Sequence, residues 1–335
     1  MKILIVQTSF LGDTILSTPV IKEVRNLYSG AEIWMMTTPL SSQLVENDPD
    51  LKGVITYDKR GTESGFKGLF RMAKKLKGMN FDIVYSLHKS YRTSALLFLS
   101  KIPKRIGFSV AKLGFLYHAT HDRDPKDHDV VRNLSILSGD TDIRKIENTE
   151  MRLYPDKSEN IDNKLTSRLE KLGKYAVLVP GSAWETKMWH FSEFKEAAQY
   201  LVEKGFKVVL LGAASDKKVS EKVAYNDDLV DLSGKTSIKE AVYIVSKSIL
   251  VVCNDSMSLH MASALKIPNL AIFCATVPEM GYGPWANKAI VVEKDIECRP
   301  CSRHGQRKCP LSTDECMHGL IKDAKHAIDG LLRES

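Results

Sequence analysis

Short apolar runs alternate with segments of helical spacing along most of this chain. In the first part, the runs have the length of buried strands, and apolar residues between them recur three and four positions apart, as in Leu69, Met72, Ala73 and Leu76. This alternation predicts parallel strands joined by helices with right-handed crossovers. The expected strands are Lys2–Val6, Ala31–Met36, Val54–Tyr57 and Phe81–Leu87.

The pattern loosens from Pro103 to about Lys174 and then restarts, which predicts a second sheet of the same kind. We place the inter-domain connection in the loose region and expect domains over residues 1–165 and 166–335. The fold class is then α/β, with two Rossmann-like doubly wound domains facing a cleft. An amphipathic helix over Leu320–Leu332 ends the pattern and can pack on either domain. The strands expected in the second half are Tyr175–Val179, Lys207–Leu211, Leu229–Leu232, Leu250–Cys253 and Asn269–Phe273.

Composition narrows the class of partner. The chain has 335 residues, 43% of them hydrophobic, and a formal net charge of +7, which favours an anionic partner such as a membrane surface, a phosphorylated small molecule or nucleic acid. No Lys/Arg-rich block with interleaved aromatic residues supports nucleic acid. The first apolar run is too short for a signal peptide, and no run is long enough to span a membrane, so we expect a cytoplasmic protein.

Two loops of the second half suit a nucleotide diphosphate. After the strand that ends at Val179, Gly181 allows close approach of a ligand, Ser182 offers a hydroxyl and Lys187 a charge, ahead of a helix N-terminus. After the strand that ends at Cys253, Asp255 and Ser256 stand at the next helix start, where they serve as a cap, a ligand site or both. His260, four residues on, is by spacing alone a packed histidine.

Acidic residues follow two further strands. Asp216 comes just after the strand Lys207–Leu211, in Gly-Ala-Ala-Ser-Asp, and such a residue can accept hydrogen bonds from ribose hydroxyls. No G-x-G-x-x-G motif follows any strand, which argues against a nicotinamide dehydrogenase. Asp13 follows the first strand and is either a helix cap or a general base toward an acceptor hydroxyl; the following helix starts near Asp13 or at Thr18-Pro19.

Clustered cysteines and basic residues complete the candidates. The spacing of four cysteines near the end of the chain fits a structural zinc site, with reduced thiols or a redox pair as alternatives. Basic groups of the first domain suit an acceptor with phosphates or carboxylates, although a solvated charged face explains them equally well. The cysteines are Cys298, Cys301, Cys309 and Cys316, and the basic residues are Lys89, Arg92, Arg105, His128 and Arg132.

Taken together, these motifs resemble the lipopolysaccharide heptosyltransferases of glycosyltransferase family 9. The resemblance rests on Gly12-Asp13 with Pro19, Pro180-Gly181-Ser182 with Lys187-Met-Trp189, the Gly212 turn, and Asn254-Asp255-Ser256 with His260. It covers nearly the whole chain. It implies the two-domain glycosyltransferase B architecture, ADP-heptose as donor and the inner core of lipopolysaccharide as acceptor. It also implies a peripheral location at the inner face of the inner membrane.

Carried over by position, the resemblance assigns roles to single residues. Asp13 matches the catalytic base, Ser182 and Lys187 match donor-phosphate contacts, and Asp216 matches a ribose contact. Gly234-Lys235-Thr236 falls where the family lines the adenine pocket, and Asp255, Ser256 and His260 match the donor-sugar and phosphate loop. Met257 stands where members often have glycine, so the exact donor sugar is left open.

The implied reaction is inverting sugar transfer without a cofactor. Asp13 takes the acceptor proton, the acceptor oxygen attacks the anomeric carbon, and ADP leaves with its charge held by Lys187, Ser182, Ser256 and helix N-termini. Two alternatives stay open: a sugar-nucleotide epimerase or hydrolase of the same fold, and a non-catalytic nucleotide-binding protein.

Overall fold

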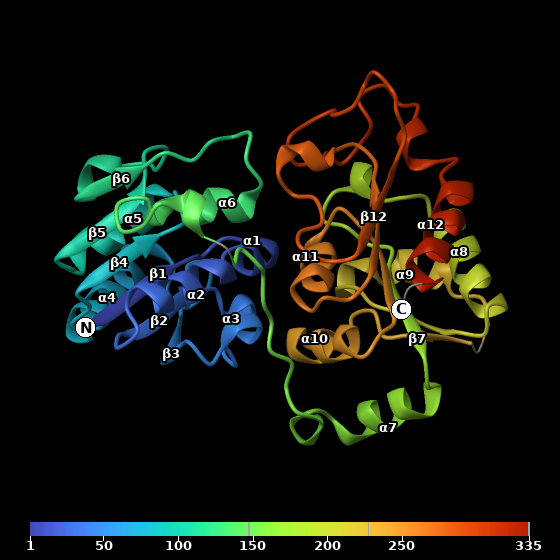
Figure 1. The fold of residues 1–335 in the computed structure, drawn as a ribbon, viewed down its shortest axis with the longest axis horizontal. Coiled ribbons are helices and arrows are strands. Elements are labelled where there is room, and N and C mark those ends of the chain that lie inside the picture. Colours follow the sequence, from blue (N-terminus) through green and yellow to red (C-terminus); the bar gives the residue numbers. More distant parts are fainter. Residues whose placement is uncertain (147, 227, 334–335) are drawn as a thin grey trace. The chain divides into compact units, whose positions relative to one another are not determined.

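The computed structural model describes residues 1–146, 148–226 and 228–333, and these form two compact units (Figure 1). Unit 1 comprises Met1–Tyr154, and unit 2 begins at Pro155. Each unit has its own hydrophobic core, and each is described by itself.

The sheet of unit 1 has six strands, all parallel, in the order β3-β2-β1-β4-β5-β6. Because β1 pairs with β2 on one side and β4 on the other, the strand order reverses between β1 and β4, and the loops after them emerge side by side. The strands are β1 (Lys2–Val6), β2 (Glu32–Thr37), β3 (Gly53–Thr56), β4 (Ile83–Ser86), β5 (Lys104–Phe108) and β6 (Ala119–His121).

Helices cover this sheet because each buries an apolar stripe on it. Leu69 and Leu76 of α4 and Leu96 and Leu97 of α5 join one buried cluster with the strand residue Val84. Removing their apolar area from water stabilises the unit by about 25 cal/mol per Å². The helices of unit 1 are α1 (Leu11–Leu16), α2 (Thr18–Leu27), α3 (Pro39–Val45), α4 (Gly65–Gly78), α5 (Tyr91–Leu99) and α6 (Asp129–Leu134).

The sheet of unit 2 repeats this topology, with six parallel strands in the order β12-β11-β10-β7-β8-β9. Its order reverses between β7 and β10, so the loops after these two strands are neighbours at its carboxyl edge. The strands are β7 (Tyr175–Val179), β8 (Lys207–Leu210), β9 (Leu229–Asp231), β10 (Leu250–Asn254), β11 (Asn269–Phe273) and β12 (Ala289–Glu293).

The last helix of unit 2 packs within that unit. Its buried face, with Ala324, Ile328 and Leu331, joins the cluster formed by α8 and the strands, and α12 contacts α8, β11 and β12. This settles which sheet the amphipathic C-terminal segment covers. The helices of unit 2 are α7 (Asn163–Leu172), α8 (Phe191–Glu203), α9 (Lys217–Val223), α10 (Ile238–Ser246), α11 (Met257–Ala264) and α12 (Ile321–Arg333).

The sequence pattern missed part of the fold. The prediction that the alternation of strands and helices is lost from Pro103 is wrong for the first part of that region. β5, β6 and α6 lie there and complete unit 1. β5 opens with Lys104-Arg105 and includes Gly107, and β6 is a short edge strand, so neither shows a clear apolar run. β12 does have such a run, Ala-Ile-Val-Val, which the prediction passed over. Near Asp13, both expected helix starts exist, since α1 and α2 are separate helices.

No helix in the described ranges combines the length and the apolar character that crossing a bilayer requires.

Candidate functional site

Gly181 lies where the loops after β7 and β8 meet. A Cβ atom at this position would come within 2.2 Å of Asp216 Cγ, so the approach of the two loops requires glycine. Asp216 in turn accepts a hydrogen bond from Ala213 N at 2.9 Å, which fixes the turn that follows β8. Ser182 directly follows Gly181, the residue at which the Asp216 carboxylate of the neighbouring loop approaches the chain.

The loop after β9 joins this pair. Gly234 N donates to Gly212 O at 2.9 Å, and a Cβ on Gly234, whose φ is +69°, would come within 2.8 Å of Ala214 Cα. Thr236, partly exposed, follows two residues later, just before α10 begins at Ile238. Ser182, Asp216 and Thr236 thus lie on three loops that follow adjacent strands at the same edge of the sheet.

Lys187 and Asp255 form an ion pair at the point where the strand order of unit 2 reverses. Lys187 Nζ lies 2.6 Å from Asp255 Oδ2, and the side chains are only 14% and 8% exposed. Thr276 Oγ1 donates to the same carboxylate oxygen at 2.7 Å. A buried charge that loses its partner is strongly destabilised. An anionic ligand at Lys187 therefore has to compete with Asp255 for the ammonium group.

Asn254 holds this part of the site in place. Its side-chain oxygen accepts from Trp189 N at 2.9 Å, and its Nδ2 donates to Pro180 O at 2.9 Å, so one buried amide joins both ends of the loop after β7 to the end of β10. The sequence motif included Asn254 but did not predict that it bridges the loop after β7 and the end of β10.

Ser256 stands at the N-cap of α11 with an unused oxygen. Within the described residues, the buried Ser256 Oγ has no hydrogen-bond partner, and no side chain caps α11. The first backbone N–H groups of a helix also lack intrahelical partners and favour negative charge. Ser256 and the start of α11 therefore have the chemistry of a phosphate site. His260 is buried within α11.

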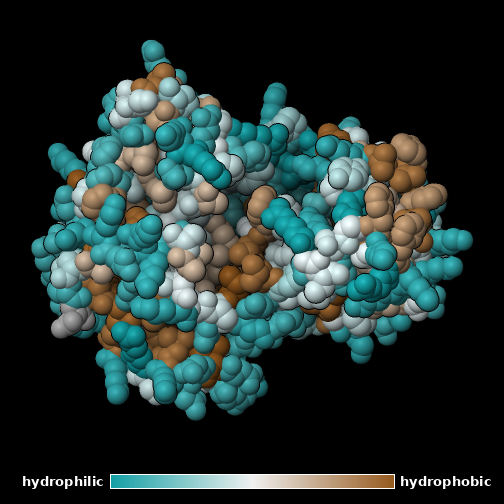
Figure 2. Space-filling model, turned by 180° about the vertical axis from the view of Figure 1, so that it is seen from behind, coloured by the Kyte–Doolittle hydropathy of each residue, from teal (hydrophilic) through white to brown (hydrophobic). Residues whose placement is uncertain are grey.

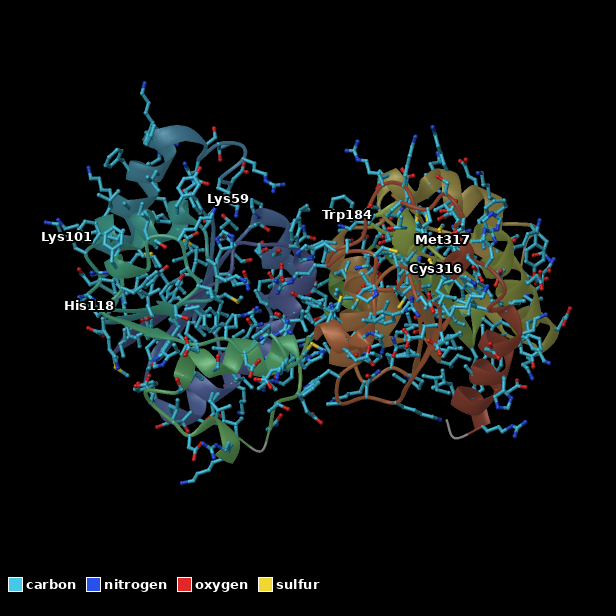
Figure 3. The ribbon with its side chains drawn as sticks, turned by 90° about the horizontal axis from the view of Figure 1, so that it is seen from above. Lys59, Lys101, His118, Trp184, Cys316 and Met317 are labelled. Carbon is cyan, nitrogen blue, oxygen red and sulfur yellow. The ribbon has the colours of Figure 1, made fainter. Side chains whose placement is uncertain are left out.

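A late segment of the chain clamps the Lys187 loop. Thr186 N donates to Gln306 O at 3.1 Å and Gln306 N to Thr186 Oγ1 at 2.8 Å, while a Cβ on Gly305 would come within 2.8 Å of Lys187 Cδ and Trp184 Cβ. At the other end of the loop, His190 N donates to Met317 O at 3.0 Å; Trp184 and Met317 are labelled in Figure 3. The sequence did not predict this support.

The clamping segment carries the four late cysteines. Burial raises the pKa of the Cys301 thiol, and Cys298 and Cys309 add to the rise. Burial also raises the pKa of Cys316 to about 11, with smaller contributions from Cys301, Cys298 and Cys309. Cys301 Sγ also lies 3.2 Å from Cys298 O, which brings two of the four cysteines together. Among residues 1–146, 148–226 and 228–333, however, no three acidic, histidine or cysteine side chains are close enough to hold a metal ion as they stand. The donor set suits zinc or iron, whereas the arrangement would have to tighten.

Asp13 is the third residue of α1 in unit 1 and its carboxylate caps that helix. Asp13 Oδ2 accepts from Phe10 N at 3.1 Å. Burial raises the pKa of the Asp13 carboxyl and Asp129 adds to the rise, while the Ser9 hydroxyl, Phe10 N and Arg123 oppose it. A carboxylate with a raised pKa is a stronger base than a solvated one.

A buried polar network supports this carboxylate. Asp129 on α6 pairs with Arg123 and, at 3.5 Å, with Arg132, and Asn133 Nδ2 links α6 to α1 through Leu16 O at 3.1 Å. Of the expected acceptor residues, Arg132 lies within α6 and His128 is the N-cap of that helix. The His128 side chain accepts a hydrogen bond from a backbone N–H of the first turn. Arg123 and Asp129 carried no sequence signal that set them apart.

Of the other expected acceptor residues, Lys89 and Arg92 lie around the loop after β4, whereas Arg105 lies at the start of β5, at the opposite edge of the parallel sheet. Arg92 Nε donates to Tyr57 Oη at 2.7 Å and its other donors reach two backbone carbonyls, including Glu63 O at 2.6 Å. Arg105 likewise donates to two backbone carbonyls. Lys89 is partly exposed directly after β4. Both arginines thus hold the local chain as well as supplying charge.

Lys59 was missed by sequence reasoning, although it follows the end of β3 by three residues. Its Nζ donates to Thr8 O at 2.6 Å, and Thr8 Oγ1 lies 3.1 Å from His88 Nδ1. Burial, helped by the charges of Lys59 and Lys89, lowers the pKa of His88 to about 4. The loops after β1, β3 and β4 are therefore tied together by a lysine and a neutral histidine.

Each unit thus has a doubly wound parallel sheet with polar groups on the loops where its strand order reverses, which is the glycosyltransferase B class of fold. Solved structures have the same fold. The glycosyl transferase family 9 protein of Veillonella parvula superposes with a TM-score of 0.84 at 22% identity, covering 100% of this chain and 98% of that one. Escherichia coli ADP-heptose LPS heptosyltransferase II gives 0.81 at 20% identity, covering 100% and 99%.

The sequence itself gives the family. The profile of glycosyltransferase family 9 (heptosyltransferase) matches residues 69–311, and the chain belongs to this family. Lipopolysaccharide heptosyltransferase 3 of Escherichia coli K12 is 27% identical over 302 residues, which cover 83% of this chain and 84% of that protein. The fold class and the family expected from the sequence are both confirmed.

Proposed function

We propose that this glycosyltransferase moves a heptose from ADP-heptose to the inner core of lipopolysaccharide with inversion. The names of its relatives support the donor and the acceptor. The observation that carries the proposal is the Lys187–Asp255 pair next to Ser256 and the start of α11. These groups offer a cation, a hydroxyl and helix amides for a diphosphate, and a carboxylate for sugar hydroxyls.

The donor would engage unit 2 in a defined way. The diphosphate takes Lys187 from Asp255 and accepts from Ser256 Oγ and Ser182, which frees the Asp255 carboxylate to accept from heptose hydroxyls. Asp216 and Thr236 contact the ribose and the adenine, and His260 helps to shape the sugar loop from within α11. The buried, ligand-free oxygen of Ser256 gains a partner in this complex.

In the reaction, Asp13 accepts the proton of the acceptor hydroxyl as its oxygen forms a bond to the anomeric carbon. The bond from that carbon to the phosphate oxygen breaks, and ADP leaves with the electron pair. Lys187, Ser182, Ser256 and the α11 amides stabilise the charge that develops on the leaving oxygen. Attack opposite to the leaving group inverts the anomeric configuration.

The acceptor side is proposed to include Lys89, Arg92 and His128; Arg132 is buried with its donors on backbone carbonyls, and Arg105 lies at the opposite edge of the sheet, so neither is placed to contact an acceptor. Basic groups suit the phosphates and carboxylates of a lipopolysaccharide core. Such an acceptor is a membrane glycolipid, so the protein would act at the inner face of the inner membrane.

Transfer is tested with ADP-heptose and a deacylated core acceptor, with product anomeric configuration read by NMR. We expect heptosylated product with the inverted configuration and ADP in equal amounts. ADP or free heptose released at the same rate without acceptor would instead favour a hydrolase, and an epimerised donor would favour an epimerase. Binding of ADP-heptose with no chemistry would leave only a nucleotide-binding role.

For the late cysteines, we propose a structural metal held by Cys298, Cys301, Cys309 and Cys316. Four thiolates suit zinc, and such a closed set would stiffen the segment that clamps the Lys187 loop. Elemental analysis of protein purified without added metal tests this. One equivalent of bound metal in the unaltered protein, and less in Cys309→Ser, would support the site. A protein that contains no metal and whose thermal stability does not change when zinc is added would exclude it.

A further inference from the structure

One stretch of unit 1 carries an unusual share of positive charge. Residues 64–121 include 11 lysines and arginines and a single acidic residue, Asp82, whereas the rest of the chain has 37 basic and 40 acidic residues. The net positive charge of the whole protein therefore originates in this stretch. It comprises α4, β4, α5, β5, the loop from Ser109 to His118 and β6.

The same stretch exposes large apolar side chains. Seven of the twelve exposed large hydrophobic side chains in the described ranges lie within it, including Phe66 and Phe115, each 81% exposed. Isolated exposed apolar residues are normal on a protein surface, but such a concentration marks an interaction surface. Figure 2 shows apolar side chains among hydrophilic ones at the end of this unit that carries β5 and β6 in Figure 1.

These side chains share one side of unit 1. α4 contacts α5, and α5 contacts the turn Gly114–Leu116. Both helices bury their inner residues in one cluster, so their outer residues face away from the sheet in the same direction. Phe66 and Phe70 lie one turn apart on α4, and Tyr91 and Phe98 lie two turns apart on α5.

Basic residues surround the exposed aromatic rings. On α4, Lys67, Arg71 and Lys74 are exposed beside the two phenylalanines. On α5, the guanidinium of Arg105 lies 5.6 Å from the centre of the Phe98 ring, and the exposed Lys101 follows the helix, well apart from Lys59 in Figure 3. Aromatic rings at the headgroup level and lysines near lipid phosphates are the features that hold proteins on anionic bilayers.

We propose that this surface, formed by α4, α5 and residues 109–118 and here called the α4–α5 face, docks on an anionic lipid bilayer. Phe66, Phe70 and Phe115 enter the headgroup region, and the lysines and arginines contact lipid phosphates. A second copy of the chain is a poor occupant because two faces of the same strong charge repel each other. The inference deepens the proposed function by placing the enzyme at the membrane of its acceptor, yet its evidence is the surface itself.

The test is co-sedimentation of the intact protein with phosphatidylcholine vesicles, with and without phosphatidylglycerol, in the absence of donor and acceptor. We expect binding only to the anionic vesicles and weakening at high salt. Lys67→Gln/Arg71→Gln/Lys74→Gln should weaken binding about a hundred-fold, since each basic residue near such a surface contributes about one factor of five. Phe66→Ser/Phe70→Ser should weaken it as well.

Unit 2 offers a control with the same spacing. Lys164, Arg168 and Lys171 are exposed on α7 at the same intervals, so Lys164→Gln/Arg168→Gln/Lys171→Gln removes equal charge elsewhere. Leu40→Ser/Leu311→Ser removes exposed apolar groups outside the face. Both controls should bind vesicles like the unaltered protein. Thermal unfolding of every variant checks that it is folded, and the two independent face variants guard against a loss of folding in either one.

Three results would overturn the proposal: no binding to anionic vesicles, equal binding to neutral ones, or equal loss in the α7 and α4 variants. Self-association or DNA binding that depends on the face, without vesicle binding, would also overturn it and identify another occupant. Transfer to a deacylated acceptor is measured in parallel. If transfer is intact but vesicle binding fails, only the docking surface is rejected. If vesicles are bound but transfer fails, only the proposed reaction is rejected.

Discussion

The Lys187–Asp255 pair is the residue-level contact on which donor binding is proposed to depend. At 2.6 Å and with little exposure, the lysine is oriented before any ligand arrives, and Thr276 keeps the carboxylate in place. A diphosphate carries two negatively charged groups and can replace the single carboxylate as the partner of Lys187. Until it binds, the ion pair with Asp255 holds the ammonium group in the site, whereas an unpaired lysine would be solvated and mobile.

Lys187→Ala should weaken ADP binding by about 1.5–3 kcal/mol, the usual contribution of a hydrogen bond to a charged group. Isothermal titration calorimetry with ADP measures the loss. Lys217→Ala is the control, because Lys217 is an exposed lysine of unit 2 that faces Glu221 on the same helix. Equal ADP affinity in the two variants would contradict the phosphate role of Lys187.

Asp13→Asn should reduce transfer about 10²–10⁴-fold, the usual contribution of a general base, with little change in the KM for ADP-heptose. The same variant should unfold at the same or a higher temperature at pH 8. Because the pKa of Asp13 is raised from 3.8 by burial, the folded state holds this proton more tightly than the unfolded chain, and stability is lost as pH rises through the raised value. The amide has no charge to bury.

Initial rates and melting curves across pH check both parts. Transfer by the unaltered enzyme should rise with pH as Asp13 ionises. A variant that transfers normally would refute the base assignment, and one that melts much lower at pH 8 would show that Asp13 acts mainly as a helix cap.

His88 should make the protein less stable in acid. Its pKa is lowered from 6.5 to about 4, so the stability that the neutral ring contributes is complete above pH 6.5 and is lost as pH falls toward 4. His88→Gln should therefore show a smaller drop in melting temperature from pH 7 to pH 5 than the unaltered protein. His118→Gln, at an exposed histidine, should keep the full drop, and identical drops in all three proteins would rule out His88 as the cause.

At the level of elements, the sequence predicted most strands and the loops that carry the candidate site. Apolar runs such as Leu250–Cys253 are obvious because both faces of a central parallel strand are buried. Edge strands such as β6 bury less and gave no run. Contacts between distant segments, such as Thr186 with Gln306 or Asp129 with Arg123, depend on packing and cannot be inferred from spacing.

The segment that clamps the Lys187 loop should affect donor binding through position alone. Gly305→Ala would place a methyl group 2.8 Å from Lys187 Cδ at a backbone φ of +85°, so the lysine has to move. We expect weaker ADP binding by calorimetry. Gly319→Ala is the control, because its φ of +78° brings similar backbone strain while its nearest neighbour is Lys294 Nζ at 3.9 Å. Equal ADP affinity in the two variants would mean that the clamp does not position Lys187.

On the scale of the whole molecule, composition alone was a poor guide to the partner. A net charge of +7 in 335 residues pointed only to something anionic. The fold shows which helices carry that charge and that aromatic rings lie among the lysines and arginines of the α4–α5 face. Sequence position alone did not reveal this, because residues of α4, α5 and the following loop become neighbours only on the folded surface.

Both sheets have the same strand order, and the residues proposed to bind the donor lie on loops and helix starts outside the strands. Exchanging a loop with that of a related enzyme therefore leaves the hydrogen-bonded ladder intact. The short stretch from Asp255 through Met257 is a natural module for such grafting. If this stretch contacts the sugar as proposed, a few substitutions in it change the sugar preference while the scaffold stays constant.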